Sequence, residues 1–311
     1  MARGRQAALL TFGLLLALLP AALGVTLVGE AYFSVFFGQR IDYLKHGLPA
    51  TSLSGLRDHL GIPAKSGENI QTVPRVFLAS LPENLVQFST AERKEIFIAA
   101  VLPLLLRSNE LILEDRARMM RFRKRLEAGR QLSQLETRWL LALARKYKMK
   151  GVPEPAKLDW DELALRVDVI PPSLGIAQAA IESGWGTSRF ALAGNAIYGQ
   201  WVWGNAPGLV PLEREEGAEH KVRSFDFLIE SVLGYSHNLN THSAYEGLRQ
   251  IRAKLRAAGQ MPEGRIMAEA LAAYSARGED YVVELKSIIR TNRFDALDHS
   301  SLAPLGRTAA P

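Results

Sequence analysis

The sequence predicts a mainly α protein with a small β-containing part, an α+β fold. Between Thr90 and Arg290, most segments carry apolar residues at helical spacing together with helix start signals. One stretch, Ile197 to Val222, is instead rich in glycine, aromatic and charged residues and suits a few short strands. At 311 residues and 48% hydrophobic, the chain is long enough to bury a substantial core.

The composition excludes several classes of chemistry and partner. The chain has no cysteine, which rules out disulfides, thiolate metal sites and a cysteine nucleophile. Lysine and arginine total 38 against 32 acids, a net charge of +6. This excess is modest compared with the dense basic patch of a nucleic-acid-binding protein, so we expect no nucleic acid partner.

The first 37 residues resemble an export segment. Arg3 and Arg5 precede an apolar run from Ala7 to Leu19, and the small residues of 20–24 are suited to signal peptidase cleavage. Residues 25–37 are also largely apolar, and about 20 apolar residues can span a membrane. We therefore expect 1–37 to be a signal peptide or a membrane anchor, and the membrane is a second expected partner through this segment.

Residues 38–150 are expected to form a connector followed by a helical region. Arg40 to Ser89 is rich in glycine and proline, which predicts an extended or loosely helical connector. A long helix is predicted from Thr90 to about Glu127, kinked or split at Pro103 because proline lacks the N–H that a helix interior needs.

A second helix follows a predicted capping box. Ser133 and Glu136 stand at capping-box spacing, and the helix after them should end by Gly151. The basic run from Arg116 to Arg130 has apolar residues interleaved; a solvated helix face is the favoured interpretation, and contact with a membrane or an anionic polymer is the alternative.

A domain of residues 151–299 is expected to follow a linker at 152–155. Asp159 and Glu162 predict a capping box for a short helix to about Val167, and Ser173 is a plausible N-cap for the next helix. That helix carries small residues that permit close packing, so we expect it to be buried. Further helices are predicted at Phe225–Asn240, Pro262–Tyr274 and Tyr281–Arg290, with a frayed tail over 300–311.

Glu182 is the leading candidate for chemistry. It falls near the C-terminal end of the buried helix, one turn after Gln178, where the helix dipole disfavours a negative charge. If Ile181, Trp185 and Phe190 surround it, desolvation also raises its pKa. A carboxyl that stays protonated near neutral pH can act as the general acid of glycoside cleavage. The alternative is a structural glutamate at a helix end.

The residues around Glu182 allow narrower statements. Gly184 and Gly186 suit a helix stop and a corner with positive φ, and Trp185 between them packs inward or offers a face to a sugar. Ser183 lacks the G-x-S-x-G context of a serine nucleophile. The histidines show no metal-ligand spacing, so we expect no metal and no cofactor: His220, His237 and His242.

The stretch GIAQAAIESGWGTSRFALAGNAIYGQ, residues 175–200, resembles the catalytic helix and loop of exported glucosaminidases of glycoside hydrolase family 73. Within that family the chain is most similar to the Bax-type proteins. The similarity continues through PGLVPLEREEGAEHKVRSFDFLIESVLGYSHNLNTHSAYEGLR and YSARGEDYVVELKSIIRTN. It covers about Asp159 to Asp298, and several segments recur in the same order.

The resemblance implies a lysozyme-like catalytic domain with a small β-containing lobe that cleaves the glycan strand of peptidoglycan after N-acetylglucosamine. It implies that Glu182 is the general acid and that Glu213 is the best match to the family's second acid. Arg214 stands where the family has an aromatic residue, and three further carboxylates compete with Glu213 for the role: Glu215, Glu216 and Glu219.

The resemblance also implies a set of substrate-binding residues and a location. Tyr274 matches a cleft tyrosine that orients substrate or intermediate, and Asn195 and Tyr198 match residues expected to bind sugar or brace the loop. Trp185, placed between the two glycines, is a further candidate for sugar binding on its own position. The implied partner is the peptidoglycan glycan strand, reached from the periplasm or from a membrane anchor that faces the wall. A peptidoglycan amidase and a non-catalytic wall-binding or membrane-tethered scaffold remain alternatives.

Overall fold

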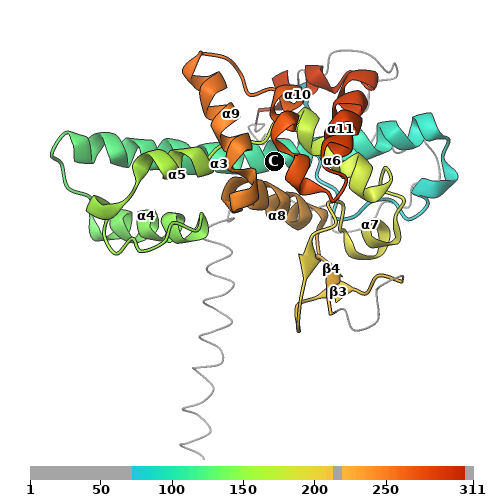
Figure 1. Cartoon of the computed structure of the whole chain (residues 1–311), viewed down its shortest axis with the longest axis horizontal. Helices are drawn as coiled ribbons and strands as arrows, with labels where there is room; N and C mark the ends of the chain where they lie inside the picture. Colours follow the sequence, from blue (N-terminus) through green and yellow to red (C-terminus); the bar gives the residue numbers. More distant parts are fainter. Residues whose placement is uncertain (1–71, 213–218, 305–311) are drawn as a thin grey trace, which may run out of the picture. The chain divides into compact units, whose positions relative to one another are not determined.

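The computed structural model describes residues 72–212 and 219–304, and these residues form a mainly α fold with short strands (Figure 1). The expected fold class is confirmed. The α-helices of the described residues are α3 (Thr90–Glu127), α4 (Gln134–Lys146), α5 (Trp160–Arg166), α6 (Pro172–Ser183), α7 (Arg189–Gly194), α8 (Leu228–Thr241), α9 (Glu246–Ala257), α10 (Gly264–Met267) and α11 (Glu279–Thr291). The strands are β1 (Thr72–Val73), β2 (Trp201–Val202), β3 (Gly208–Leu209), β4 (Lys221–Arg223) and β5 (Ser301–Leu302).

Helix α3 forms the centre of the core. A capping box between Ser89 and Glu92 starts it, and it continues through Pro103 to Glu127 without a break. The predicted split at Pro103 is therefore wrong. Residues 100–106 are all buried and α3 packs against α6 and α8, so tertiary contacts hold the helix together across the proline.

Within the described residues, α3 is also the helix long and apolar enough to cross a membrane. Of its apolar window, 72% is buried inside the protein, which is the pattern of a core helix. The predicted export segment, residues 1–37, lies outside the described residues.

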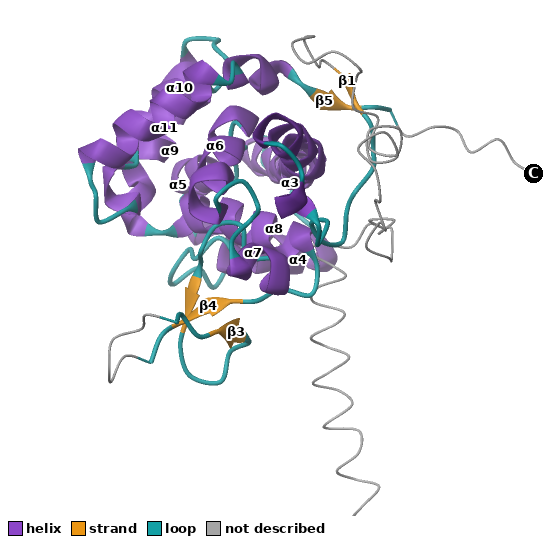
Figure 2. Cartoon of the chain, turned by 90° about the vertical axis from the view of Figure 1, so that its right-hand side faces the viewer, coloured by secondary structure: helices purple, strands orange, loops and turns teal. Residues whose placement is uncertain are grey.

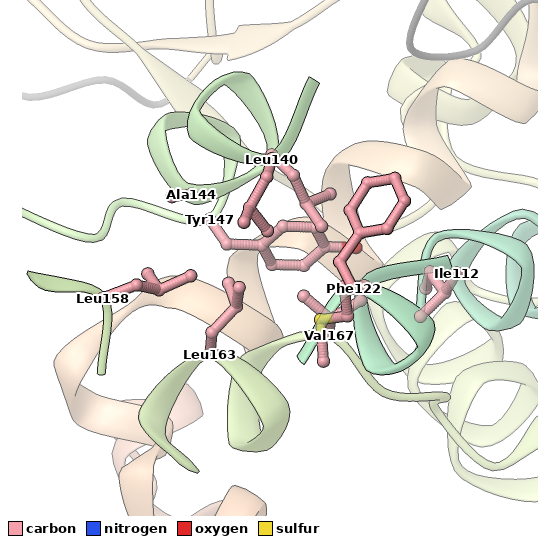
Figure 3. Close-up of a cluster of buried hydrophobic side chains, with 10 residues drawn as sticks. Ile112, Phe122, Leu140, Ala144, Tyr147, Leu158, Leu163 and Val167 are labelled. Atoms are coloured by element: carbon pink, nitrogen blue, oxygen red, sulfur yellow. The ribbon is translucent and has the colours of Figure 1, made fainter. Parts of the chain in front are cut away.

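The second half of α3 packs with α4 and α5 around an apolar cluster (Figure 3). The capping box of Ser133 and Glu136 starts α4 as predicted. The buried members of the cluster are Ile112, Met119, Phe122, Leu140, Leu143, Ala144, Tyr147, Leu158, Leu163 and Val167. Residues on both sides of the linker expected at 152–155 thus share one core, and all described residues belong to a single compact unit.

The starts of α5 and α6 differ in part from the sequence prediction. Asp159 caps α5 by accepting hydrogen bonds from the N–H groups of Asp161 and Glu162, but Glu162 does not complete a capping box and binds Arg166 instead. Ser173 is not the N-cap of α6, because Pro171 occupies that position and has no side-chain cap.

A distant carboxylate replaces the missing cap of α6. Asp298, in the 3₁₀ helix η6 (Phe294–His299), accepts hydrogen bonds from the N–H of Ser173 at 2.8 Å and from its hydroxyl at 2.7 Å. It also accepts one from the N–H of Gly264 in α10 at 2.9 Å. Asp298 therefore satisfies buried donors that lack a helical partner at the start of α6 and ties three elements together.

The strands form two small sheets. In the antiparallel sheet of order β2-β4-β3, Val222 faces Trp201 on one side and Leu209 on the other, which confirms the short strands predicted between Ile197 and Val222. The second sheet pairs β1 with β5 in parallel, as Figure 2 shows. Ser301 and Leu302 were expected in a frayed tail; that expectation is wrong, because they pair with Thr72 and Val73 and Leu302 is buried.

The described part of the connector also enters the core. It contributes buried apolar side chains rather than an exposed linker: Val73, Phe77, Leu78, Leu81 and Leu85. Arg75 donates to the carbonyl of Ala303 and binds Glu110 of α3 at 2.5 Å, so both ends of the described chain are held against α3. Apolar burial therefore organises the described part of the connector, residues 72–89.

Candidate active site

Helix α6 is built for close packing and ends at a fixed corner. A Cβ at Gly175 would lie 2.5 Å from a methyl carbon of Leu105, so α3 and α6 approach more closely than any larger residue would allow. At the other end Gly184, Trp185 and Gly186 have φ of 58°, 58° and 80°. The predicted corner with positive φ is present at both glycines, and Trp185 adopts the same left-handed conformation.

Glu182 lies in the last turn of α6 and is partly buried. Tyr281 of α11 donates a hydrogen bond to its Oε1 at 3.0 Å. Its Oε2 lies 3.7 Å from the position a Cβ would take on Gly199, which has a φ of 59°. The absence of a side chain at Gly199 thus leaves the space beside this oxygen open.

The pKa of the Glu182 carboxyl is raised above its ordinary value. Burial is the largest cause, and the negative charge of Glu284 adds to it. The hydrogen bond from Tyr281 and the positive charge of Arg277 act in the opposite direction without cancelling the effect. The direction agrees with the sequence-based prediction and favours a carboxyl that keeps its proton closer to neutral pH.

A chain of hydrogen bonds connects Glu182 to the buried core. Tyr235 of α8 donates to Oε1 of Gln178 at 2.7 Å, and the amide of Gln178 donates to the hydroxyl of Tyr281 at 3.0 Å. That hydroxyl then donates to Glu182. Each group in this relay has a defined donor or acceptor role, so the proton of Tyr281 is directed toward Glu182.

Further tyrosine rings pack around the relay. Tyr198 stacks on Tyr235 with ring centroids 3.8 Å apart, and Tyr274 stacks on Tyr281 at 5.6 Å. Tyr245 packs against Tyr274 at 5.8 Å. Burial raises the pKa of Tyr245, Tyr274 and Tyr281, and the charge of Glu182 raises each of them further. These hydroxyls therefore remain neutral donors beside the carboxyl.

Trp185 and Phe190 pack into the core of the protein. The indole of Trp185 contacts Phe97 of α3 edge-on at 5.9 Å and Phe294 at 6.2 Å, and the ammonium of Lys94 lies 4.5 Å from its centroid. Phe190 packs against the small cluster of Ala196, Val222 and Phe225. For Trp185 these contacts correspond to the inward-packing role that the sequence left open.

Asn195 and Tyr198 brace the loop after α7. Asn195 ends α7 in the left-handed conformation, and its side-chain amide donates to the carbonyls of Phe225 and Asp226 at 3.1 and 3.2 Å. Tyr198 is 2% exposed. Tyr274 donates a long hydrogen bond of 3.4 Å to the carbonyl of Tyr198, which connects this loop to the wall of the site.

The structure describes only one of the four acids considered for the second catalytic role. Glu213, with Glu215 and Glu216, lies outside the described residues, while Glu219 is exposed. Among the described residues, the carboxylate whose charge acts on Glu182 is Glu284 of α11, which is held by Arg277 at 2.6 Å. Sequence reasoning did not identify Glu284.

The histidines have structural contacts. His237 Nε2 lies 2.7 Å from the carbonyl of Lys146, His242 accepts a hydrogen bond from the N–H of Ala244, and His220 stacks on Trp201. In the described part of the chain, no group of three or more histidine, aspartate or glutamate side chains is placed to hold a metal ion.

Gln178, Tyr235 and Tyr281 form the relay to Glu182, and the sequence carried a signal for Gln178 alone. Gln178 lies four residues before Glu182, so the helical period places both on the same face of α6. Tyr235 and Tyr281 reach the site from α8 and α11, 57 and 103 residues away from Gln178. The arrangement can hold a proton on Glu182 and present it to a bound oxygen atom.

Comparisons with known proteins identify relatives of this chain. The family model described as mannosyl-glycoprotein endo-beta-N-acetylglucosaminidase matches residues 158–294, which include the helix and corner around Glu182. The protein named "Protein bax" of Escherichia coli (strain K12) is 34% identical over 219 residues, covering 69% of this chain and 75% of that protein. No solved structure matches the chain.

Proposed function

The chain belongs to the Bax-type proteins with a glucosaminidase domain, and from this premise we propose that it is an exported peptidoglycan hydrolase that cleaves the glycan strand after N-acetylglucosamine. The family supports a glycoside hydrolase kind of activity and a peptidoglycan substrate. The observation that carries the proposal is Glu182: a partly buried carboxyl with a raised pKa, held at a helix end by the hydroxyl of Tyr281.

In the proposed reaction, Glu182 donates its proton to the glycosidic oxygen as the bond from that oxygen to the anomeric carbon breaks. Water supplies the oxygen that ends on the anomeric carbon and releases a proton, so the sum is hydrolysis. The corner at 184–186 and the hydrogen bond from Tyr281 fix the carboxyl in position, and general acid catalysis depends on such placement.

We assign the second acidic role to Glu213, on the family pattern of a glutamate followed by a glycine four residues later. Tyr274 is proposed to orient the substrate, and its position beside Tyr281 in the wall of the site supports this role. Asn195 and Tyr198 are proposed to act indirectly, by holding the loop that carries Gly199 against Glu182.

Export is part of the proposal because peptidoglycan lies outside the cytoplasmic membrane. Its support in the sequence is the order of Arg3 and Arg5 before a long apolar run, with positive charge tending to stay on the cytoplasmic side. The catalytic part then acts in the periplasm, either free or held by residues 1–37.

Digestion of purified peptidoglycan tests the function directly. The parent protein should release glycan fragments with N-acetylglucosamine at the new reducing end, identified by mass spectrometry after borohydride reduction. The matched variant Glu182→Gln should release almost none. Release of stem peptides with intact glycan strands would instead identify an amidase, and binding without any cleavage would identify a non-catalytic scaffold.

A further inference from the structure

Two tryptophans lie exposed on the small antiparallel sheet. Trp201 of β2 is 58% exposed and Trp203, two residues further on, is 61% exposed. Their ring centroids are 6.3 Å apart at an interplanar angle of 62°, so the two indoles form one aromatic surface. Large aromatic side chains left uncovered in this way indicate a binding surface more often than a structural role.

The register of the sheet shows which way these rings face. Trp201 stands opposite Val222, and side chains of opposed residues project to the same face of a sheet. Val222 is buried against Ala196 and Phe225, on the loop beside Glu182 and on the segment before α8. Trp201 therefore projects to the same face of the sheet as the buried Val222, and Trp203 packs against it just beyond the end of β2.

The aromatic surface follows the candidate active site closely along the chain. Trp201 follows Gly199 by two residues, so their Cα atoms are at most about 7 Å apart, and Gly199 is the residue that adjoins Oε2 of Glu182. Gln200 between them donates from its side-chain amide to the carbonyl of Ser231 in α8 at 3.1 Å. This contact ties Gln200, the residue before Trp201, to α8.

Another aromatic ring stacks on the indole of Trp201. His220 stacks on it with centroids 4.3 Å apart and an interplanar angle of 11°. Trp201 is still 58% exposed, so much of its indole remains accessible to a ligand. A ring held in one orientation loses less conformational entropy when a ligand binds than a freely rotating one would.

We propose that Trp201 and Trp203 form a sugar-stacking platform that binds the glycan strand on one side of Glu182. A hexopyranose ring presents C–H bonds on its face, and the electron-rich face of an indole attracts such groups while burying apolar area. The platform deepens the proposed function and rests on it, since it is the position next to Glu182 that selects a glycan as the occupant.

Binding measured without turnover tests the platform. The full chain carrying Glu182→Gln is titrated calorimetrically with N-acetylglucosamine oligomers of increasing length. Replacement of either tryptophan by alanine should weaken binding of the longer oligomers about tenfold, as truncation of a central aromatic residue typically does. Oligomers too short to reach the platform should bind equally well to all variants, and Trp201→Phe should recover part of the loss.

Leu212→Ala is the matched control, because Leu212 is an apolar residue of the same lobe that is 87% exposed and has no place in the platform. Its oligomer affinity should equal that of the Glu182→Gln parent. Unchanged affinity in both tryptophan variants overturns the platform. A second result also overturns the platform: the tryptophan variants bind glycan oligomers normally but bind phosphatidylglycerol vesicles more weakly than the Glu182→Gln protein does. That result would make a lipid surface the occupant.

The test separates the platform from the proposed activity. If the tryptophan variants lose glycan affinity but the protein with native Glu182 releases no new reducing ends from peptidoglycan, the platform stands and the hydrolase proposal fails. If the protein with native Glu182 hydrolyses peptidoglycan and the tryptophan variants bind glycan normally, the hydrolase proposal stands and the platform is overturned.

Discussion

The hydroxyl of Tyr281 donates a hydrogen bond of 3.0 Å to Oε1 of Glu182, a residue 99 positions earlier in the chain. The same hydroxyl accepts a hydrogen bond from Gln178, so its proton has one direction in which to point. Tyr281 therefore stabilises the charged form of a carboxyl whose burial favours the neutral form. The balance between these two effects sets the pH at which Glu182 releases its proton, and it leads to the first two predictions.

Replacing Glu182 with glutamine should preserve the fold and reduce hydrolysis by about 10²- to 10⁴-fold, because the amide keeps the shape of the side chain and has no proton to give. The measurement is the rate of reducing-end release from purified peptidoglycan. Thermal unfolding of the variant should match that of the parent. Equal rates for the two proteins would eliminate Glu182 as the general acid.

Replacing Tyr281 with phenylalanine should raise the pKa of Glu182 further, because the bond that favours its carboxylate is lost. A general acid loses activity as it deprotonates, so the alkaline limb of the rate-against-pH profile should move to higher pH. The control is Tyr274→Phe, whose hydroxyl bonds the carbonyl of Tyr198 instead of Glu182. An alkaline limb that stays in place in Tyr281→Phe would contradict the assigned role.

Removing Asp168 should destabilise the protein strongly. This buried carboxylate, 2% exposed, binds Arg256 through two hydrogen bonds of 2.6 Å and lies within 4 Å of the guanidinium groups of Arg116 and Arg252. Burial alone would raise its pKa, but the three arginines outweigh burial and hold the pKa below its usual value. Asp168→Ala leaves the buried Arg252 without its counter-charge and should lower the free energy of unfolding by about 3–5 kcal/mol.

Asp161→Ala is the matched comparison for Asp168, measured by urea unfolding. The side chain of Asp161 is 85% exposed in its ion pair with Arg123, and exposed pairs contribute little to stability. Its free energy of unfolding should therefore stay close to that of the parent. Similar free energies of unfolding for Asp168→Ala and Asp161→Ala would show that Arg116, Arg252 and Arg256 do not depend on the Asp168 carboxylate.

Asp298 should give a stability difference that depends on pH. Burial raises its pKa from 3.8 to about 6, so the folded protein binds this proton more tightly than the unfolded chain does. That contribution is fully present below the unfolded pKa and is lost as pH rises through the folded pKa.

Asp298→Ala lacks this contribution and also leaves the buried N–H groups of Ser173 and Gly264 without an acceptor. The parent should be more stable than the variant throughout. Its advantage should be larger near pH 4 than near pH 7, on the order of 2–3 kcal/mol larger for a shift of this size. Urea unfolding at both pH values measures it, and a constant difference would contradict the raised pKa.

A C-terminal reporter that is active only outside the cytoplasm should be active in cells that express the full chain. The reason is the order of Arg3 and Arg5 before the apolar run, which we propose directs the remainder of the chain across the membrane. Cell fractionation and the mature N-terminus distinguish cleavage from anchoring. A soluble cytoplasmic product that still begins at Met1 or Ala2 would contradict export.

The features that depend on local chemistry follow from the amino-acid sequence alone. Helical spacing predicted α3, α4 and α6, the capping residues Asp159 and Ser133 were read from their positions, and the glycines after Glu182 predicted a corner with positive φ. The raised pKa of Glu182 was also predicted, because its position at the end of a buried helix follows from the pattern of small and apolar residues.

The partners of these elements depend on how the helices pack in three dimensions. Tyr235 and Tyr281 meet Gln178 and Glu182 because α8 and α11 pack on α6, and no local periodicity encodes which face meets which. Asp298 replaces the cap that Ser173 was expected to supply. Burial of apolar area is non-directional and sums over the whole molecule, so it can outweigh a local preference and place residues far apart in the sequence in one site.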